Sequence, residues 1–109
     1  QKLKRKPSSL QAADYSAASF YLKAVKSTGT DDPDTIMKWF KSNKINDMFA
    51  HDGYVRADGR MIYDMYLFQV KTPKESKGPW DYYKVAQKLP GDKVYTTPAE
   101  SKCPLLKKS

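Results

Sequence analysis

The feature that most constrains the fold is an apolar run, residues 60–71, that directly follows a tight-turn signal. Asp58-Gly59 marks the turn, because glycine adopts a positive φ at no steric cost and aspartate tolerates it. If the run forms one strand, its two faces carry Ile62, Tyr66, Phe68 and Val70 on one side, and Met61, Tyr63, Met65 and Leu67 on the other. A strand that is apolar on both faces needs cover on both sides. The two helices or the tail of a 109-residue chain could cover one face, so we expect a piece of a larger α/β protein.

Two amphipathic helices are predicted before this run. Ser8 or Ser9 can cap a helix that ends near Thr28, because Gly29 is a good left-handed stop. Its apolar positions follow helical spacing and are Leu10, Ala13, Ala17, Phe20, Tyr21, Ala24 and Val25. Asp32-Pro33 then opens a second helix that ends near residues 42–43. Its buried stripe is expected to be Ile36, Met37 and Phe40, with Trp39 beside it.

Two or three antiparallel strands are predicted after the helices. Residues 54–56 and 60–71 pair across the turn, and residues 80–87 are a third candidate. Pro90-Gly91-Asp92 is a further turn, and a thinly apolar tail follows it. The predicted fold class is therefore an α/β fragment, in which two amphipathic helices precede a two- to three-stranded antiparallel meander.

The composition leaves one alternative function open. The net charge is +8, and the chain contains eight Tyr, four Phe and two Trp. A basic, aromatic-rich chain of this size could be a small nucleic-acid-binding module, whose binding would weaken steeply with salt. The charge is mostly interleaved with acidic residues, however, and the dense cluster is confined to residues 2–6. A lysine-rich surface explains this pattern better.

No catalytic, metal or cofactor site is predicted. His51 and Cys103 are the only residues of their kinds, and they are far apart in sequence, so they form neither a zinc site nor a nucleophile–base pair. A disulfide partner of Cys103, if it has one, lies outside this chain. The aspartates at 31, 32 and 34 are explained by helix capping. Asp64 lies within the apolar run, and we expect Arg56 or Arg60 to pair with it.

Four stretches of the chain carry a resemblance to a known family. They are residues 11–17 with 21–26, residues 29–32, residues 58–61 with Asp64-Met65-Tyr66-Leu67-Phe68-Gln69-Val70-Lys71, and Glu75-Ser76-Lys77-Gly78-Pro79-Trp80-Asp81-Tyr82-Tyr83-Lys84 with residues 90–92. From about Pro7 to Lys107, the chain resembles the carboxyl-terminal part of the type I periplasmic solute-binding proteins of branched-chain amino-acid and amide ABC transporters. It departs from them in lacking their first two thirds, and in having Tyr63 where this subgroup often has His.

The resemblance implies a two-lobed fold that closes over a small solute. Residues 1–52 would be a helical segment of the first lobe. Residues 53–109 would form the crossover hairpin, third strand and tail of the second lobe and hinge. The implied function is non-enzymatic capture of a branched-chain amino acid, amide, urea or aromatic acid in the periplasm, for delivery to an ABC permease in the membrane.

The resemblance also places a ligand-facing segment at the start of the first helix, which contains Gln11, Asp14 and Tyr15. A helix start offers free N–H groups and a positive dipole end that suit a carboxylate. The alternative is that Tyr15 is a core residue, Asp14 a first-turn charge and Gln11 a surface residue. Because most of the family's ligand contacts lie in the part this chain lacks, we expect it to self-associate and to bind no amino acid alone.

Overall fold

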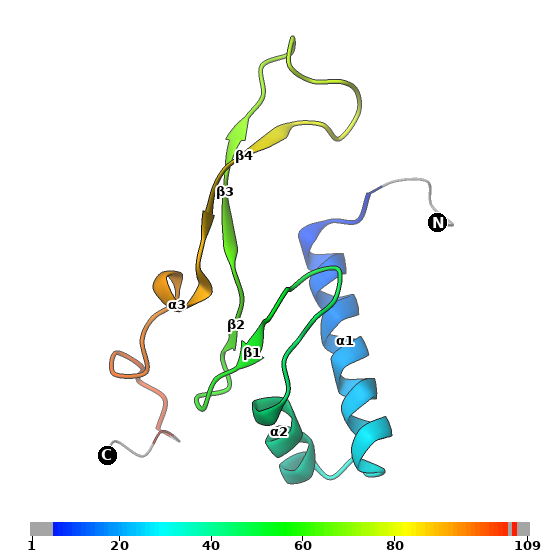
Figure 1. The fold of residues 1–109 in the computed structure, drawn as a ribbon, viewed down its shortest axis with the longest axis vertical. Helices are drawn as coiled ribbons and strands as arrows, with labels where there is room; N and C mark the ends of the chain where they lie inside the picture. Colours follow the sequence, from blue (N-terminus) through cyan, green and yellow to red (C-terminus); the bar gives the residue numbers. More distant parts are fainter. Residues whose placement is uncertain (1–5, 105, 107–109) are drawn as a thin grey trace.

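The computed structural model describes residues 6–104 and 106. Its elements are α1 (Ser9–Thr28), α2 (Pro33–Ser42), β1 (Tyr54–Val55), β2 (Met61–Ile62), β3 (Met65–Val70), β4 (Tyr83–Leu89) and α3 (Gly91–Val94). Figure 1 shows α1 and α2 side by side, with the β1–β2 hairpin next to them and the β3–β4 ribbon extending away. Within the described residues, no helix is both long and apolar enough to cross a membrane.

The ends of α1 lie where the capping residues predict them. Ser8 and Gln11 form a capping box, in which each side chain accepts a hydrogen bond from the backbone N–H of the other. Gly29 ends the helix in the left-handed conformation, at φ 72°. The buried residues of α1 are Ser16, Phe20 and Ala24. The predicted apolar stripe is thus only partly correct, because α2 covers one narrow face and leaves other stripe residues, such as Leu10, exposed.

The second helix closes the core of the molecule. The Asp32 carboxylate accepts the Thr35 amide at 2.9 Å, and Pro33 occupies the first turn, as predicted. From α2, the rings of Phe40 and Trp39 pack on Phe20 at centroid distances of 4.9 and 5.1 Å. Such aromatic pairs contribute beyond the area that they bury.

All of the buried hydrophobic residues in the described part of the chain precede Tyr63. They are Phe20, Ala24, Ile36, Ile45, Ala50 and Ile62. A loop after α2 joins this core through a bridge between Ile45 and Gly53. The Asp47 carboxylate accepts hydrogen bonds from the backbone amides of Phe49 and Ala50, which hold the loop in its turn. It also accepts a hydrogen bond of 2.6 Å from the buried Ser16 hydroxyl of α1.

The predicted continuous strand at 60–71 is wrong, because the run is split between two sheets. β2 pairs antiparallel with β1, whereas β3 pairs antiparallel with β4. The break falls at Tyr63 and Asp64, where the Asp64 side chain bonds to Lys88 at the end of β4 and to Gly91 at the start of α3. The third strand begins at Tyr83, not at residue 80, because Trp80 has a positive φ of 72° in the preceding loop.

The β3–β4 ribbon lies outside the core. All six residues of β3 are exposed, so neither the helices nor the tail covers a face of this strand, contrary to the expectation. The radius of gyration is 17.4 Å, whereas a compact domain of this length has a value of about 13 Å. In Figure 1 the ribbon projects from the helical part as a separate arm. The elongated shape thus follows from a strand pair with no layer packed on it.

Candidate functional site

The three predicted ligand-binding residues lie together on one face of α1. Gln11, Asp14 and Tyr15 are spaced three and four positions apart, so their side chains share a face. Because successive helical residues are rotated by about 100°, this face is roughly opposite the buried face of α1. All three residues are exposed. We call these three residues the α1 triplet.

The triplet residues have different local roles. The Gln11 side chain accepts the Ser8 amide at 3.0 Å, so it already belongs to the helix cap. Asp14 is exposed on the second turn. The Tyr15 side chain is 62% exposed, so the alternative reading of Tyr15 as a core residue is wrong. An exposed ring beside a carboxylate and an amide can contact a solute that another part of a protein holds against this face.

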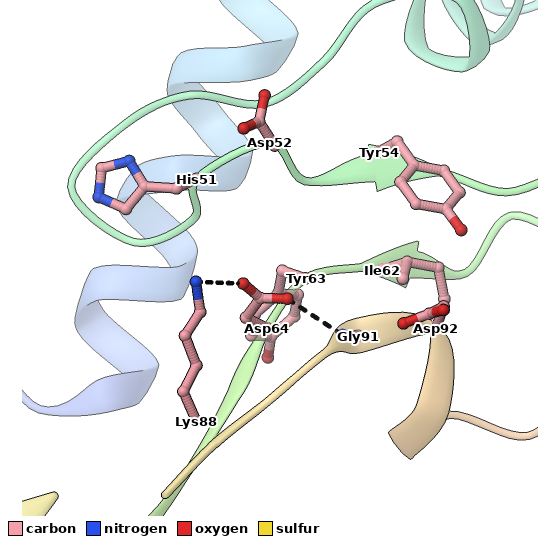
Figure 2. Close-up of a pocket in the computed structure, with 9 residues that line it drawn as sticks. All are labelled: His51, Asp52, Tyr54, Ile62, Tyr63, Asp64, Lys88, Gly91 and Asp92. Carbon is pink, nitrogen blue, oxygen red and sulfur yellow. Dashed lines mark hydrogen bonds and ion pairs between the residues drawn. The ribbon is translucent and has the colours of Figure 1, made fainter.

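A polar cavity of about 250 Å³ lies where the core meets the β3–β4 ribbon. Figure 2 shows the residues that line it: His51, Asp52, Tyr54, Ile62, Tyr63, Asp64, Lys88, Gly91 and Asp92. They come from β1 and the loop before it, from β2 and the link after it, from the end of β4 and from the start of α3. No motif in the sequence predicted that these residues lie together.

Asp64 is the centre of this cavity. Its carboxylate accepts the Gly91 amide at 3.1 Å and pairs with the Lys88 ammonium at 2.6 Å. The bond from Lys88, followed by the bond from Gly91, lowers the pKa of Asp64, and the same pair raises the pKa of Lys88. Both carboxylate oxygens are therefore already engaged within the chain.

The predicted partner of Asp64 is wrong. Arg56 instead forms a two-pronged pair with Asp58, at 2.6 and 2.9 Å, across the β1–β2 turn. The Arg60 guanidinium lies over the ring of Tyr95, 5.7 Å from its centroid. Asp58 captures Arg56 because it is only two residues away, and no comparable local signal identifies Lys88 as the partner of Asp64.

Gly91 allows α3 to approach the link between β2 and β3. A Cβ atom at this position would lie 2.6 Å from the Tyr63 carbonyl oxygen, so only glycine fits. The turn predicted at Pro90-Gly91-Asp92 was the available sequence signal, although it did not indicate this contact. The bonds from Asp64 to Lys88 and Gly91 therefore form a junction between the core and the β3–β4 ribbon.

An apolar cavity of about 250 Å³ also lies within the core, between the two helices and the β1–β2 hairpin. It is lined by Ser16, Ala17, Phe20, Met37, Phe40, Ile45, Val55, Gly59 and Met61. Ligand pockets usually have a few polar groups that fix the ligand's orientation. Here the Ser16 hydroxyl already donates a hydrogen bond to Asp47, so this cavity offers few polar groups that could orient a ligand.

The order and geometry of these elements match known proteins. A family model described as periplasmic binding protein matches residues 1–79. A crystal structure of a periplasmic binding protein from Burkholderia mallei is 55% identical, with a TM-score of 0.91 over 97% of this chain. A branched chain amino acid ABC transporter periplasmic ligand-binding protein from Burkholderia xenovorans is 38% identical, with a TM-score of 0.89 over 94% of this chain. None of the curated proteins compared with the chain matches it.

The chain belongs to the periplasmic binding protein family. It spans 28% of the length of each of the two solved structures. The predicted family and the predicted fold class, a helix pair followed by antiparallel strands that forms part of a larger protein, are thereby confirmed. The assignment of the α1 triplet as ligand-binding stays a prediction, as does the division into lobes.

Proposed function

We propose that this chain is the carboxyl-terminal part of a periplasmic solute receptor, which captures a small solute and presents it to an ABC permease in the membrane. The observation that carries the proposal is the match to the Burkholderia mallei protein, at 55% identity and a TM-score of 0.91 over 97% of this chain. Such a receptor performs no chemistry on its ligand. Its affinity comes from enclosing the solute between two lobes, with a few polar groups fixing its orientation.

The proposed solute is a branched-chain amino acid, with amides, urea and aromatic acids as the other classes to be tested. The choice is supported by the name of the Burkholderia xenovorans protein. In this chain, we assign ligand contacts to the α1 triplet. Asp14 would suit an ammonium group, the Gln11 amide a polar group and the exposed Tyr15 ring an apolar side chain.

We place residues 1–52 in the first lobe and the crossover within residues 53–109. The distribution of buried residues supports a crossover near Tyr63 and Asp64, because the hydrophobic core of the described chain ends at Ile62. Lobe closure would then turn the ribbon relative to the helices about this link. Both lobes would lie in the periplasm, beside the permease.

A chimera tests the proposed function. This chain replaces the matching 28% of the Burkholderia xenovorans protein, and isothermal titration measures its binding of leucine, isoleucine, valine, acetamide, urea and benzoate. We expect one solute class to bind. Asp14→Asn and Tyr15→Ala should each weaken that binding about tenfold or more, the loss of roughly one good polar or apolar contact.

The matched control is Leu22→Ala, which truncates another exposed side chain of α1, two turns beyond the triplet. It should leave the affinity unchanged. Circular dichroism confirms that each variant is folded. A folded chimera that binds none of these solutes would refute the proposed function, whereas unchanged affinity in both triplet variants would refute only the site.

A further inference from the structure

The dipeptide Asp-Gly occurs twice in the chain, at residues 52–53 and 58–59. The backbone nitrogen of such a glycine can attack the carboxyl group of the aspartate before it, because glycine has no side chain to hinder the approach. The nitrogen forms a bond to the carboxyl carbon Cγ, and the amide proton and the carboxyl hydroxyl leave as water, which gives a five-membered succinimide. Water then opens the ring at either carbonyl. Opening at the α-carbonyl carbon breaks its bond to nitrogen and leaves isoaspartate, whose main chain runs through the former side chain.

The glycine amides of the two dipeptides are engaged to the same degree. The Gly53 amide donates a hydrogen bond of 3.0 Å to the Ile45 carbonyl, and the Gly59 amide donates one of 2.9 Å to the Arg56 carbonyl. Each bond must open before the nitrogen can attack. The amides therefore do not distinguish the two dipeptides, and any difference in reactivity comes from the carboxylates.

The Asp58 carboxylate is held firmly. It accepts two hydrogen bonds from the Arg56 guanidinium, at 2.6 and 2.9 Å, and one from the Arg60 amide at 3.2 Å. Its side chain is 6% exposed. The bond from Arg56 is the main cause that lowers the pKa of Asp58 to about 2. Because the carboxyl hydroxyl must leave as the succinimide forms, a carboxylate that is kept ionised and in place reacts poorly.

The Asp52 carboxylate is held loosely. Among the described residues its one ion-pair partner is the Lys44 ammonium, at 3.7 Å, and the two side chains are 76% and 64% exposed. An exposed pair at this distance restrains little. Figure 2 shows the carboxylate directed away from Asp64 and Lys88. The backbone of Asp52 has a positive φ of 54°, a conformation that stores strain in a residue other than glycine.

We propose that Asp52-Gly53 is a site of spontaneous isoaspartate formation, and that Arg56 protects Asp58-Gly59 from the same reaction. Isoaspartate adds a methylene group to the main chain directly before Gly53. Gly53 and Ile45 exchange two hydrogen bonds, and a Cβ atom at Gly53 would already lie 3.3 Å from the Ala50 side chain. A longer main chain cannot keep this fit, so the modified loop before β1 detaches from the core.

The test incubates this chain near neutral pH in water enriched in the heavy oxygen isotope, which enters when the succinimide opens. Mass spectrometry of peptides then measures the isotope and isoaspartate at each dipeptide. Asp52 should convert about tenfold faster than Asp58 or more, the effect of one charge-assisted hydrogen bond on a rate. In guanidinium chloride, which removes the fold, the two rates should become similar.

Two glutamine variants test the protection by Arg56. Arg56→Gln should raise the rate at Asp58 about tenfold. Lys44→Gln is the matched control, because it removes the cation beside Asp52, and it should leave the rate at Asp52 nearly unchanged. Circular dichroism checks that both variants are folded, and the wild-type comparison decides the inference even if Arg56→Gln is not.

Three results would overturn the inference. The first is a folded wild-type chain in which Asp52 converts no faster than Asp58. The second is an excess of conversion at Asp52 that persists in guanidinium chloride, since the cause would then be the neighbouring sequence and not the fold. The third is a folded Arg56→Gln variant in which Asp58 converts as slowly as in the wild type.

Discussion

Gly59 shows how a single residue determines the β1–β2 turn. Its φ is 81°, a conformation that a side chain disfavours, and there is open space around the position of a Cβ atom. Gly59→Val should therefore cost about 1–3 kcal/mol through backbone strain alone. Urea unfolding followed by circular dichroism measures this loss.

Asparagine provides the control for that substitution, because it tolerates the left-handed region. Gly59→Asn should retain most of the stability that Gly59→Val loses. Equal unfolding midpoints for Gly59→Val and the wild type would contradict the assigned turn.

Asp58 makes the turn sensitive to acid. The Asp58 and Arg56 side chains are 6% and 15% exposed, and the hydrogen bond from Arg56 is the main cause that lowers the pKa of Asp58 to about 2. The unfolded value is about 3.9. A carboxylate with a lowered pKa in the folded state stabilises the fold above the unfolded pKa and loses this contribution as the pH falls towards 2.

We therefore expect Asp58→Asn to be less stable than the wild type at pH 7, and to lose less stability between pH 5 and pH 2. Urea unfolding at pH 7, 5, 4, 3 and 2 measures how the free energy of unfolding of each protein changes with pH. Parallel pH profiles for the two proteins would show that the pair contributes nothing to acid sensitivity.

Gly91 couples two elements that are distant in sequence. Because a Cβ atom would lie 2.6 Å from the Tyr63 carbonyl oxygen, Gly91→Ala should push the start of α3 away from the link. Overpacking of this kind costs about 1–3 kcal/mol. Hydrogen exchange should show faster exchange of the backbone amide at position 91, which bonds to Asp64 in the wild type, with little change in α1. Uniform acceleration across the chain would contradict a local junction.

The elements that could be predicted from the sequence are those with local causes. The capping residues Ser8 and Asp32, together with Gly29, fixed the helix ends, because each acts within a few residues of itself. The split after β2 could not be predicted, since Asp64 bonds to Gly91, 27 residues away. The polar residue within the apolar run was a signal of this break, although the sequence alone did not identify its partner.

The same holds for the candidate site, because its local placement could be predicted from the sequence but its distant contacts could not. Gln11, Asp14 and Tyr15 were expected at the start of the first helix, and they lie in the first two turns of α1. What a solute would contact opposite them depends on polypeptide outside this chain. The cavity at the junction was missed because its lining comes from residues 51–92, which no short motif connects.

On the scale of the whole molecule, we expect the chain alone to self-associate through the exposed apolar face of β3 and β4, which carries Tyr66, Phe68, Val70, Tyr83 and Val85. Repulsion between copies with a net charge of +8 opposes this, and salt screens such repulsion over about 8–10 Å at physiological strength. Association measured by light scattering should therefore strengthen from low to high salt and weaken in Phe68→Lys. A monodisperse monomer at every salt concentration would contradict this expectation.

The most direct test of the account is to titrate leucine, isoleucine and valine into this chain alone and into the chimera with the Burkholderia xenovorans protein. We argue that the chain supplies one part of a solute site, and that the rest of a longer receptor completes it. We expect no measurable binding by the chain alone, and a Kd of micromolar order for one of the solutes in the chimera, which is about −8 kcal/mol. Tight binding of a branched-chain amino acid by a monomer of this chain would contradict the account.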